Sequence, residues 1–179
     1  TFAQQGEIAS RHYSMKDGLP DLGIDAVIQD RNGFIWLATY SGLSKFDGYT
    51  FTNFRNNPVS TNTLSTNRTT ALWEDKGGRL WIGHAQGFDL FDPATERFVL
   101  HWADSGKGNI MVLRFKEMKD GKLWICTSHG IYIADTETLG IEKLTVHSRW
   151  TWDVAEWRDG SLLSANAGGG FYYENPKTN

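Results

Sequence analysis

The chain has 179 residues, of which 40% are hydrophobic and 13% aromatic, so it holds enough apolar material for a sizeable core. Its 18 Lys and Arg residues against 21 Asp and Glu residues give a net charge of -3, which excludes the basic surface that binding to nucleic acid or an anionic membrane requires. The single cysteine, Cys126, excludes an intramolecular disulfide and a cysteine-rich metal site.

The N-terminal residues 1–23 precede the repeated part of the chain. The first of them, "TFAQQ", fit the small-residue end of a secretory signal peptide, with Thr1 and Ala3 at the two positions that must be small. An ordinary disordered terminus is the alternative. No stretch of the chain approaches the roughly 18 consecutive apolar residues of a membrane-spanning helix, so membrane contact is expected only through segments outside this chain.

A pattern of glycine, tryptophan and glycine repeats along the chain. The glycine of the first turn recurs at intervals of 45, 43 and 39 residues, which is a structural period. An apolar residue stands six positions before it, a tryptophan or leucine three positions after it, and a second glycine nine positions after it. The four sets are Val27, Gly33, Trp36 and Gly42; Leu72, Gly78, Trp81 and Gly87; Phe115, Gly121, Trp124 and Gly130; and Val154, Gly160, Leu163 and Gly169.

Each unit predicts three antiparallel strands joined by two tight turns. The strand runs are rich in branched and aromatic residues and are bounded by Gly, Asp and Asn, with no helical period. First strands are expected at 25–30, 70–75, 113–118 and 153–158, second strands at 34–39, 79–84, 122–127 and 161–166, and third strands at 43–47, 88–92, 131–135 and 170–174. Weaker fourth strands are expected at 51–54, 98–102 and 141–146.

These units predict an all-β chain of β-propeller blades, with about four four-stranded antiparallel repeats that form a partial propeller or half-propeller. A tryptophan on the second strand can cover the sheet of the neighbouring blade. Trp36, Trp81 and Trp124 are therefore expected at equivalent buried positions between blades. The expected blades lie near 24–67, 68–109, 110–149 and 150–179.

The fourth unit ends soon after its third strand, so its sheet needs a strand from elsewhere. The strand-like segment "IASRHYSM", residues 8–15, is the candidate closing strand. One alternative is a homodimer in which each copy lends this segment to the fourth blade of the other. A closed four-blade monomer and an open fragment are the other two.

The segments "YSMKDGLP" and "IQDRNGFIWLATYSGLSKFDGYTF" resemble the start and first blade of the two-component regulator propeller family. The likeness spans roughly residues 8–174 and is strongest in the first two units. It implies a periplasmic ligand-sensing module of a hybrid histidine kinase or diguanylate cyclase. It also implies a longer protein, with more blades, a β-sandwich module, a membrane helix and a cytoplasmic output domain.

The sequence offers no constellation for catalysis, a metal or a cofactor, and we assign none. No two of the five histidines have a spacing that would place them together as metal ligands; they are His12, His84, His101, His129 and His147. The turns "DRNG" and "DKGG" lack the further carboxylates of a calcium loop, so Asp30 and Asp75 are expected to bond the amides of their own turns.

A ligand site is expected on the propeller face where the turns between second and third strands meet the connections between blades. Aromatic, Arg, His and Asn side chains at this face suit a small polar molecule or an oligosaccharide. The candidate ligand-binding residues are Tyr40, Arg68, His84, Gln86, His129, Arg149, Trp150, Trp152 and Asn166.

Three functions remain open at this stage. The first is a periplasmic sensor module of a transmembrane signalling receptor, without catalysis of its own. The second is a propeller enzyme such as a polysaccharide lyase, which would need clustered Tyr, His and Arg on the binding face. The third is a scaffold that binds proteins through a broad apolar face. The fold alone does not choose among them.

Overall fold

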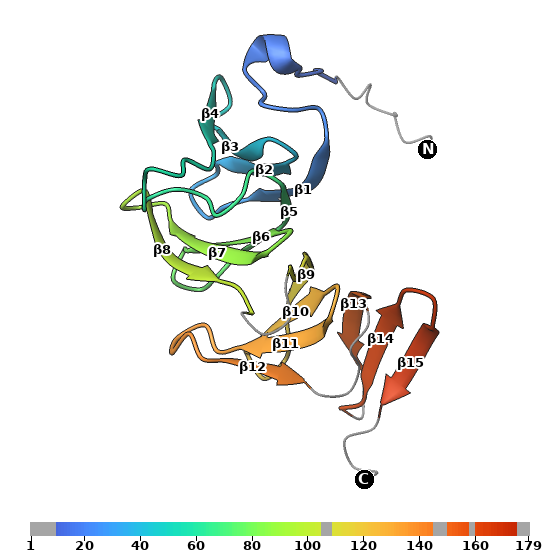
Figure 1. The fold of residues 1–179 in the computed structure, drawn as a ribbon. Coiled ribbons are helices and arrows are strands. Elements are labelled where there is room, and N and C mark those ends of the chain that lie inside the picture. The colour runs from blue at the N-terminus through green and yellow to red at the C-terminus, as the bar shows by residue number, and fades with distance from the viewer. Residues whose placement is uncertain (1–9, 105–108, 145–149, 158–159, 175–179) are drawn as a thin grey trace, which may run out of the picture.

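The computed structural model describes residues 10–104, 109–144, 150–157 and 160–174. These residues form four antiparallel sheets that follow one another in chain order along an open arc, with the N- and C-terminal ends at opposite tips (Figure 1). Each sheet is built from consecutive strands, so the strand order within it is the sequence order. The all-β prediction and the division into repeated blades are confirmed.

The first three blades have four strands and the fourth has three. Blade one contains β1 (Ile24–Gln29), β2 (Ile35–Thr39), β3 (Gly42–Phe46) and β4 (Phe51–Phe54), and blade two contains β5 (Thr69–Glu74), β6 (Leu80–His84), β7 (Gly87–Asp92) and β8 (Arg97–Trp102). Blade three contains β9 (Val112–Glu117), β10 (Leu123–Thr127), β11 (Gly130–Ala134) and β12 (Ile141–Leu144), and blade four contains β13 (Thr151–Glu156), β14 (Leu162–Asn166) and β15 (Gly170–Glu174).

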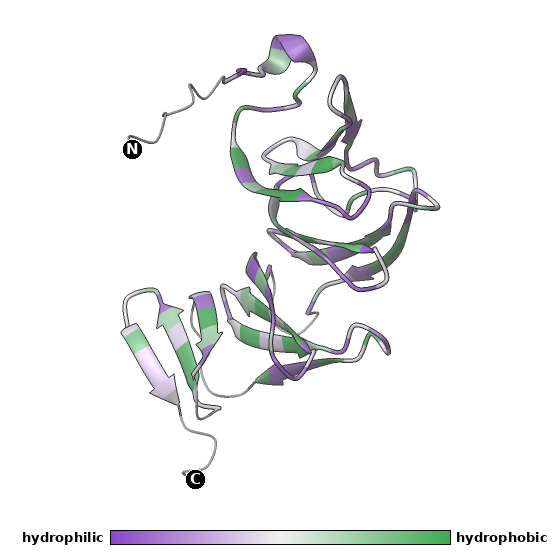
Figure 2. Cartoon of the chain, turned by 180° about the vertical axis from the view of Figure 1, so that it is seen from behind, coloured by the Kyte–Doolittle hydropathy of each residue, from purple (hydrophilic) through white to green (hydrophobic). Residues whose placement is uncertain are grey.

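Apolar clusters fill the three interfaces between neighbouring blades. Hydropathy alternates along the strands and the turns are mostly polar (Figure 2). Trp36 packs against Leu80 and Ile82 of the next blade, and Trp81 packs against Phe115 and Ile125 of the blade after that. Both indole rings are fully buried, which confirms their predicted place between blades.

The first turn of blades one and two is closed by an aspartate that also binds the tryptophan. Asp30 Oδ1 accepts hydrogen bonds from the amides of Asn32 and Phe34, as predicted, and its Oδ2 accepts one of 2.8 Å from Trp36 Nε1. In blade two, Asp75 Oδ2 accepts a bond of 3.2 Å from Trp81 Nε1. One carboxylate therefore orders the turn and satisfies a buried indole N–H.

Blade three departs from this arrangement at Trp124, which is only partly buried. Met118 stands where blades one and two have their aspartate, six residues before the tryptophan. Among the described residues, Trp124 Nε1 is buried and has no hydrogen-bond partner. The expectation of three buried tryptophans is thus confirmed for Trp36 and Trp81 and wrong for Trp124, which is only partly buried.

The second turn needs glycine because the backbone there has positive φ and lies close to the next strand. Gly42 and Gly87 have φ of 123° and 139°, and a Cβ on Gly87 would overlap the carbonyl oxygen of Trp102. In blade four the residue that pairs with the end of the second strand is Gly170, not Gly169. The turn there is one residue longer, which corrects the predicted alignment.

The expected closing strand at residues 8–15 is not a strand in its described part. Residues 10–14 have no regular structure, and Met15–Asp17 form a 3-10 turn. Ser14 and Asp17 cap this turn reciprocally, and Tyr13 packs edge-on against Phe46 at 4.8 Å. Local capping thus holds the segment on blade one, and residues 8 and 9 lie outside the described part.

The two outer faces of the arc lack a neighbouring blade in this structure. On blade four, Phe171 and Tyr173 are 67% and 53% exposed, although their equivalents in blade two, Phe88 and Leu90, are buried at a blade interface. On blade one, Val27 is 61% exposed. Among the described residues, no helix has the length and apolar character needed to cross a membrane.

Candidate functional site

One end of the sheets gathers the turns between second and third strands beside the connections that lead into the first strands. Backbone hydrogen bonds fasten them together, from the Tyr40 amide to Gly23 O at 3.0 Å and from the Ser128 amide to Met111 O at 2.9 Å. In blade four the Ala167 amide donates to Trp150 O at 2.9 Å. We call this end of the sheets the inner rim, and its defining residues are Tyr40, Arg68, Gln86, His129, Trp150 and Trp152.

Tyr40 and Arg68 meet across the interface between blades one and two. The Arg68 guanidinium lies 4.8 Å from the centre of the Tyr40 ring. Tyr40 is 48% exposed and Arg68 is also exposed, so both the ring and the cation are accessible. An aromatic face beside a guanidinium can stack on a flat or ring-shaped ligand and donate hydrogen bonds to its oxygens.

Trp150 and Trp152 form a second exposed aromatic pair, on blade four. Their rings are 5.7 Å apart and they are 41% and 49% exposed. Exposed indole pairs are uncommon in a monomeric surface and suit apolar faces of a ligand. Arg149, the neighbouring candidate, lies outside the described residues.

Two candidate residues prove to be buried rather than displayed. His84 is 1% exposed, and its Nδ1 accepts a hydrogen bond from the Gln86 amide. In blades one and three the hydroxyls of Thr39 and Thr127 accept the equivalent bond, from the amide two residues further along the chain. Asn166 is 6% exposed and accepts a bond from Thr151 Oγ1. His84 orders its own turn and Asn166 joins the first and second strands of blade four, so the expectation of their display is wrong.

The remaining candidates are accessible. Gln86 is exposed, and His129 is partly buried with its Nδ1 2.9 Å from Ser128 Oγ. The structure therefore brings Tyr40 and Arg68 together, and Trp150 and Trp152 together, and leaves Gln86 and His129 on the turns between them.

A polar cluster in blade two was not predicted from the sequence, and of its members only His84 is among the candidate residues. Asp89 is fully buried on β7 and receives hydrogen bonds from the Ser65 amide at 2.8 Å and from Ser65 Oγ at 2.6 Å. His101 Nδ1 lies 2.7 Å from Asp89 Oδ1, and His84 Nε2 lies 3.3 Å from the same oxygen. The carboxylate of Asp89, between two apolar residues of "FDLFD", was the sequence signal for this cluster.

Asp89 stays ionised in this setting. Burial alone would raise its pKa, but the adjacent His84 imidazole and the hydrogen bonds from Ser65 outweigh burial and lower the pKa below its usual 3.8. With Asp89 ionised, His101 Nδ1 carries the hydrogen and donates a hydrogen bond to the carboxylate. Ser65 Oγ lies beside this same nitrogen at 3.0 Å, so His101 cannot act as the base of a serine nucleophile.

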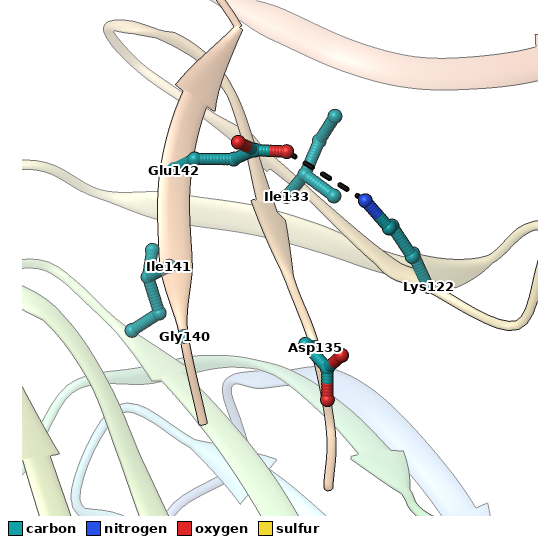
Figure 3. Close-up of a pocket in the computed structure, with 6 residues that line it drawn as sticks. All are labelled: Lys122, Ile133, Asp135, Gly140, Ile141 and Glu142. Atoms are coloured by element: carbon teal, nitrogen blue, oxygen red, sulfur yellow. Dashed lines mark ion pairs between the residues drawn. The ribbon is translucent and has the colours of Figure 1, made fainter. Parts of the chain in front are cut away.

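Two neighbouring pockets lie at the opposite end of blades two and three. One, of about 330 Å³, is lined by Lys122, Ile133, Asp135 and Glu142, and Lys122 Nζ is 3.8 Å from Glu142 Oε1 (Figure 3). The larger one, of about 610 Å³, shares Lys122 and Asp135. Both pockets carry acidic and basic side chains, among which Lys122 pairs with Glu142 and Arg79 with Asp75, so neither presents one sign of charge to a ligand.

The described residues offer little to redox or metal chemistry. Burial raises the pKa of the Cys126 thiol to about 12, which keeps it protonated. Within the residues that the structure describes, no group of three or more His, Cys, Asp and Glu side chains is arranged to hold a metal ion.

The repeated four-stranded blades and their aromatic interfaces define a β-propeller domain, of which this chain forms an arc. Residues 18–41 match the family described as two component regulator propeller, which confirms the resemblance over the first repeat. Over 63 residues the chain is 36% identical to Histidine kinase P4 of Formosa agariphila. That match covers 35% of this chain and 5% of the kinase.

Solved propellers share the fold. The extracellular domain of a putative hybrid two component system from B. thetaiotaomicron has a TM-score of 0.70 at 19% identity, over 89% of this chain and 22% of that chain. Virginiamycin B lyase from Staphylococcus aureus has a TM-score of 0.59 at 14% identity, over 90% of this chain and 59% of that chain. The chain thus spans about a fifth of that extracellular domain.

Proposed function

We propose that this chain is part of the extracytoplasmic ligand-sensing propeller of a two-component signalling receptor. The observation that carries the proposal is the match of residues 18–41 to the two component regulator propeller repeat. The identity to a histidine kinase and the fold shared with the extracellular domain of a hybrid two component system support it further. In such a receptor the membrane segment and the output domain lie elsewhere in the protein.

The ligand contacts of this proposal are the exposed side chains of the inner rim. Tyr40 with Arg68, on blades one and two, and Trp150 with Trp152, on blade four, give two aromatic platforms at the same end of their sheets, one of them with a cation. Such platforms stack on sugar rings and other flat polar molecules, and the guanidinium binds their hydroxyl or carboxylate oxygens. We therefore propose a small polar molecule or an oligosaccharide as the ligand.

The homodimer stays a prediction alongside this function. It required each copy to lend residues 8–15 to its partner, whereas Tyr13 packs on Phe46 and Phe51 of its own first blade. Light scattering at high protein concentration decides between a mass near 20.2 kDa and twice that mass.

A binding screen tests the ligand-sensing role. The complete extracytoplasmic region is titrated with neutral, acidic and sulfated oligosaccharides, with binding measured by calorimetry. We expect a ligand whose affinity falls about tenfold or more in Arg68→Ala and in Trp152→Ala, since each removes a stacking or charged contact. Val59→Ala, at a side chain that is 93% exposed and away from the inner rim, is the matched control. Equal binding by all four proteins would contradict the inner-rim site.

A further inference from the structure

A separate open cavity lies at the segment that joins blade one to blade two. Residues 55–68 connect β4 to β5, and residues 56–58, 60, 61 and 63–65 of this segment line a cavity of about 300 Å³ together with His101 of β8. The lining carries hydroxyls and amides, among them Asn56, Asn57, Thr63 and Ser65, and includes no Lys, Arg, Asp or Glu. The cavity shares no residue with the inner rim.

The segment over this cavity is held in place from both ends. Leu64 is fully buried in the cluster between blades one and two. Asn56 Nδ2 donates to Leu64 O at 2.6 Å and to Ser65 O at 3.1 Å, and Thr63 Oγ1 donates to Arg55 O at 2.6 Å. Because these internal bonds already fix the conformation of the connection, a ligand need not order it on binding.

Asp89 sets the orientation of the one imidazole in the cavity. His101 donates from Nδ1 to the buried carboxylate, so in the neutral ring Nε2 carries a lone pair. His101 is 40% exposed and lines the cavity, and the ring nitrogen that faces the buried carboxylate is Nδ1. The ring also stacks on Phe98, at 5.9 Å and 17° between planes. The result is a fixed hydrogen-bond acceptor at the cavity wall.

The other blades show that the fold does not need this arrangement. At the position of Asp89, two residues after the second glycine, blade one has Ser44 and blade three has Tyr132. Opposite them on the fourth strand stand Asn53 and Lys143, where blade two has His101. Burying a carboxylate costs free energy that a serine or tyrosine avoids. A role for the carboxylate in positioning His101 and Ser65 explains why blade two alone of these three has it.

We propose that this cavity binds a neutral, polyhydroxylated small molecule of about monosaccharide size, with one ligand hydroxyl donating to His101 Nε2. Its volume is at the lower end of the range for small-molecule sites. The hydroxyl and amide lining matches a ligand that both donates and accepts hydrogen bonds. A charged ligand would find no opposite charge among the side chains that line the cavity. The proposal goes beyond the inner-rim function and does not depend on it.

Amide chemical-shift mapping on the isotope-labelled chain tests the site. The probes are methyl glycosides of glucose, galactose and mannose, and N-acetylglucosamine, titrated into the millimolar range, with glucuronate and glucosamine as charged counterparts. We expect at least one neutral sugar to shift the amides of residues 56–65 and His101 in a saturable way, and the charged sugars to shift them much less. No saturable shift with any neutral sugar, or equal shifts with the charged ones, would overturn the proposal.

His101→Asn separates ligand binding from stability. The asparagine Nδ2 can replace Nδ1 as donor to Asp89, whereas the acceptor Nε2 is lost. We expect binding of the responding sugar to weaken about threefold to tenfold with a nearly unchanged melting temperature. Val59→Ala, in the same connecting segment but outside the cavity lining, should bind as the parent does. Unchanged binding in His101→Asn, or an equal loss in Val59→Ala, would show that the cavity is not the site.

Discussion

Arg31 of blade one and Glu74 of blade two form an ion pair across their interface, with Arg31 Nε 2.8 Å from Glu74 Oε1. The same pair recurs at the next two interfaces, as Lys76 with Glu117 at 3.0 Å and Lys119 with Glu156 at 3.4 Å. Each cation stands two residues before the first-turn glycine of its blade, and each glutamate four residues before that of the next blade. The repeat thus places opposite charges across every interface.

The Arg31 pair should be the strongest of the three. Arg31 also donates from its amide to Glu74 Oε2 and from Nη2 to Asp75 O. Arg31→Ala keeps the amide bond but removes both charge-assisted bonds of the side chain, to Glu74 Oε1 and to Asp75 O. We expect the free energy of unfolding to fall by about 1 kcal/mol in urea denaturation. Lys122→Ala is the control, because its pair with Glu142 is long and exposed and should contribute almost nothing. An equal effect of the two substitutions would show that the interblade pair contributes no more to stability than an exposed pair does.

Substituting a blade tryptophan by phenylalanine should lower the free energy of unfolding more where the indole N–H has a hydrogen-bond partner. Trp36→Phe leaves Asp30 Oδ2 without its 2.8 Å donor and should lower the free energy of unfolding by about 1 to 3 kcal/mol. Trp124→Phe removes an indole N–H that has no partner among the described residues, so its cost should be clearly smaller. Thermal denaturation of both variants measures the difference, and a larger loss in Trp124→Phe would refute the role given to the aspartate.

Two glycine substitutions should separate backbone strain from steric overlap. Gly87→Ala places a methyl group on the Trp102 carbonyl of the fourth strand, and we expect a loss of more than about 3 kcal/mol. Gly170→Ala, at φ 75°, meets nothing within 4 Å, because β15 is an edge strand, and should cost only about 1 kcal/mol. Similar losses at both positions would mean that blade four has a fourth strand covering Gly170 in solution.

Asp89 should make the stability of blade two depend on acidity. Its pKa is lowered in the folded chain, so its contribution is fully present above the ordinary value of 3.8 and is lost as the pH falls below it toward the folded pKa. We therefore expect Asp89→Asn to be less stable than the parent at neutral pH, with the difference shrinking below about pH 4. Urea denaturation between pH 3 and pH 7 measures this. A difference that is constant with pH would contradict the ionised, hydrogen-bonded state of Asp89.

The blade pattern was predictable because each strand depends on local features. Tryptophan and glycine at fixed spacing place the strands of each unit within one or two residues of those observed. The three strands of the fourth sheet among the described residues followed from the same count. The one-residue shift at Gly170 could not be predicted, because "AGGGF" offers three adjacent glycines that all tolerate positive φ.

The site was less predictable because its residues are brought together by contacts distant in sequence. Tyr40 meets Arg68 only because two blades pack side by side, although both were chosen correctly for the exposed end. His84 has the residue type of a binding residue, but its position is that of Thr39 and Thr127, where the side chain binds its own turn. Ser65 joins Asp89 across 24 residues, and no spacing rule links them.

Signal output of the complete receptor tests the sensing role most directly. With the ligand found in the binding screen, kinase or reporter activity is measured for the parent, for Arg68→Ala and Trp152→Ala, and for the control Val59→Ala. The account predicts that the parent and the control change their output with ligand, and that both inner-rim variants need about tenfold more ligand for the same change. Ligand responses that are identical in all four proteins would contradict it.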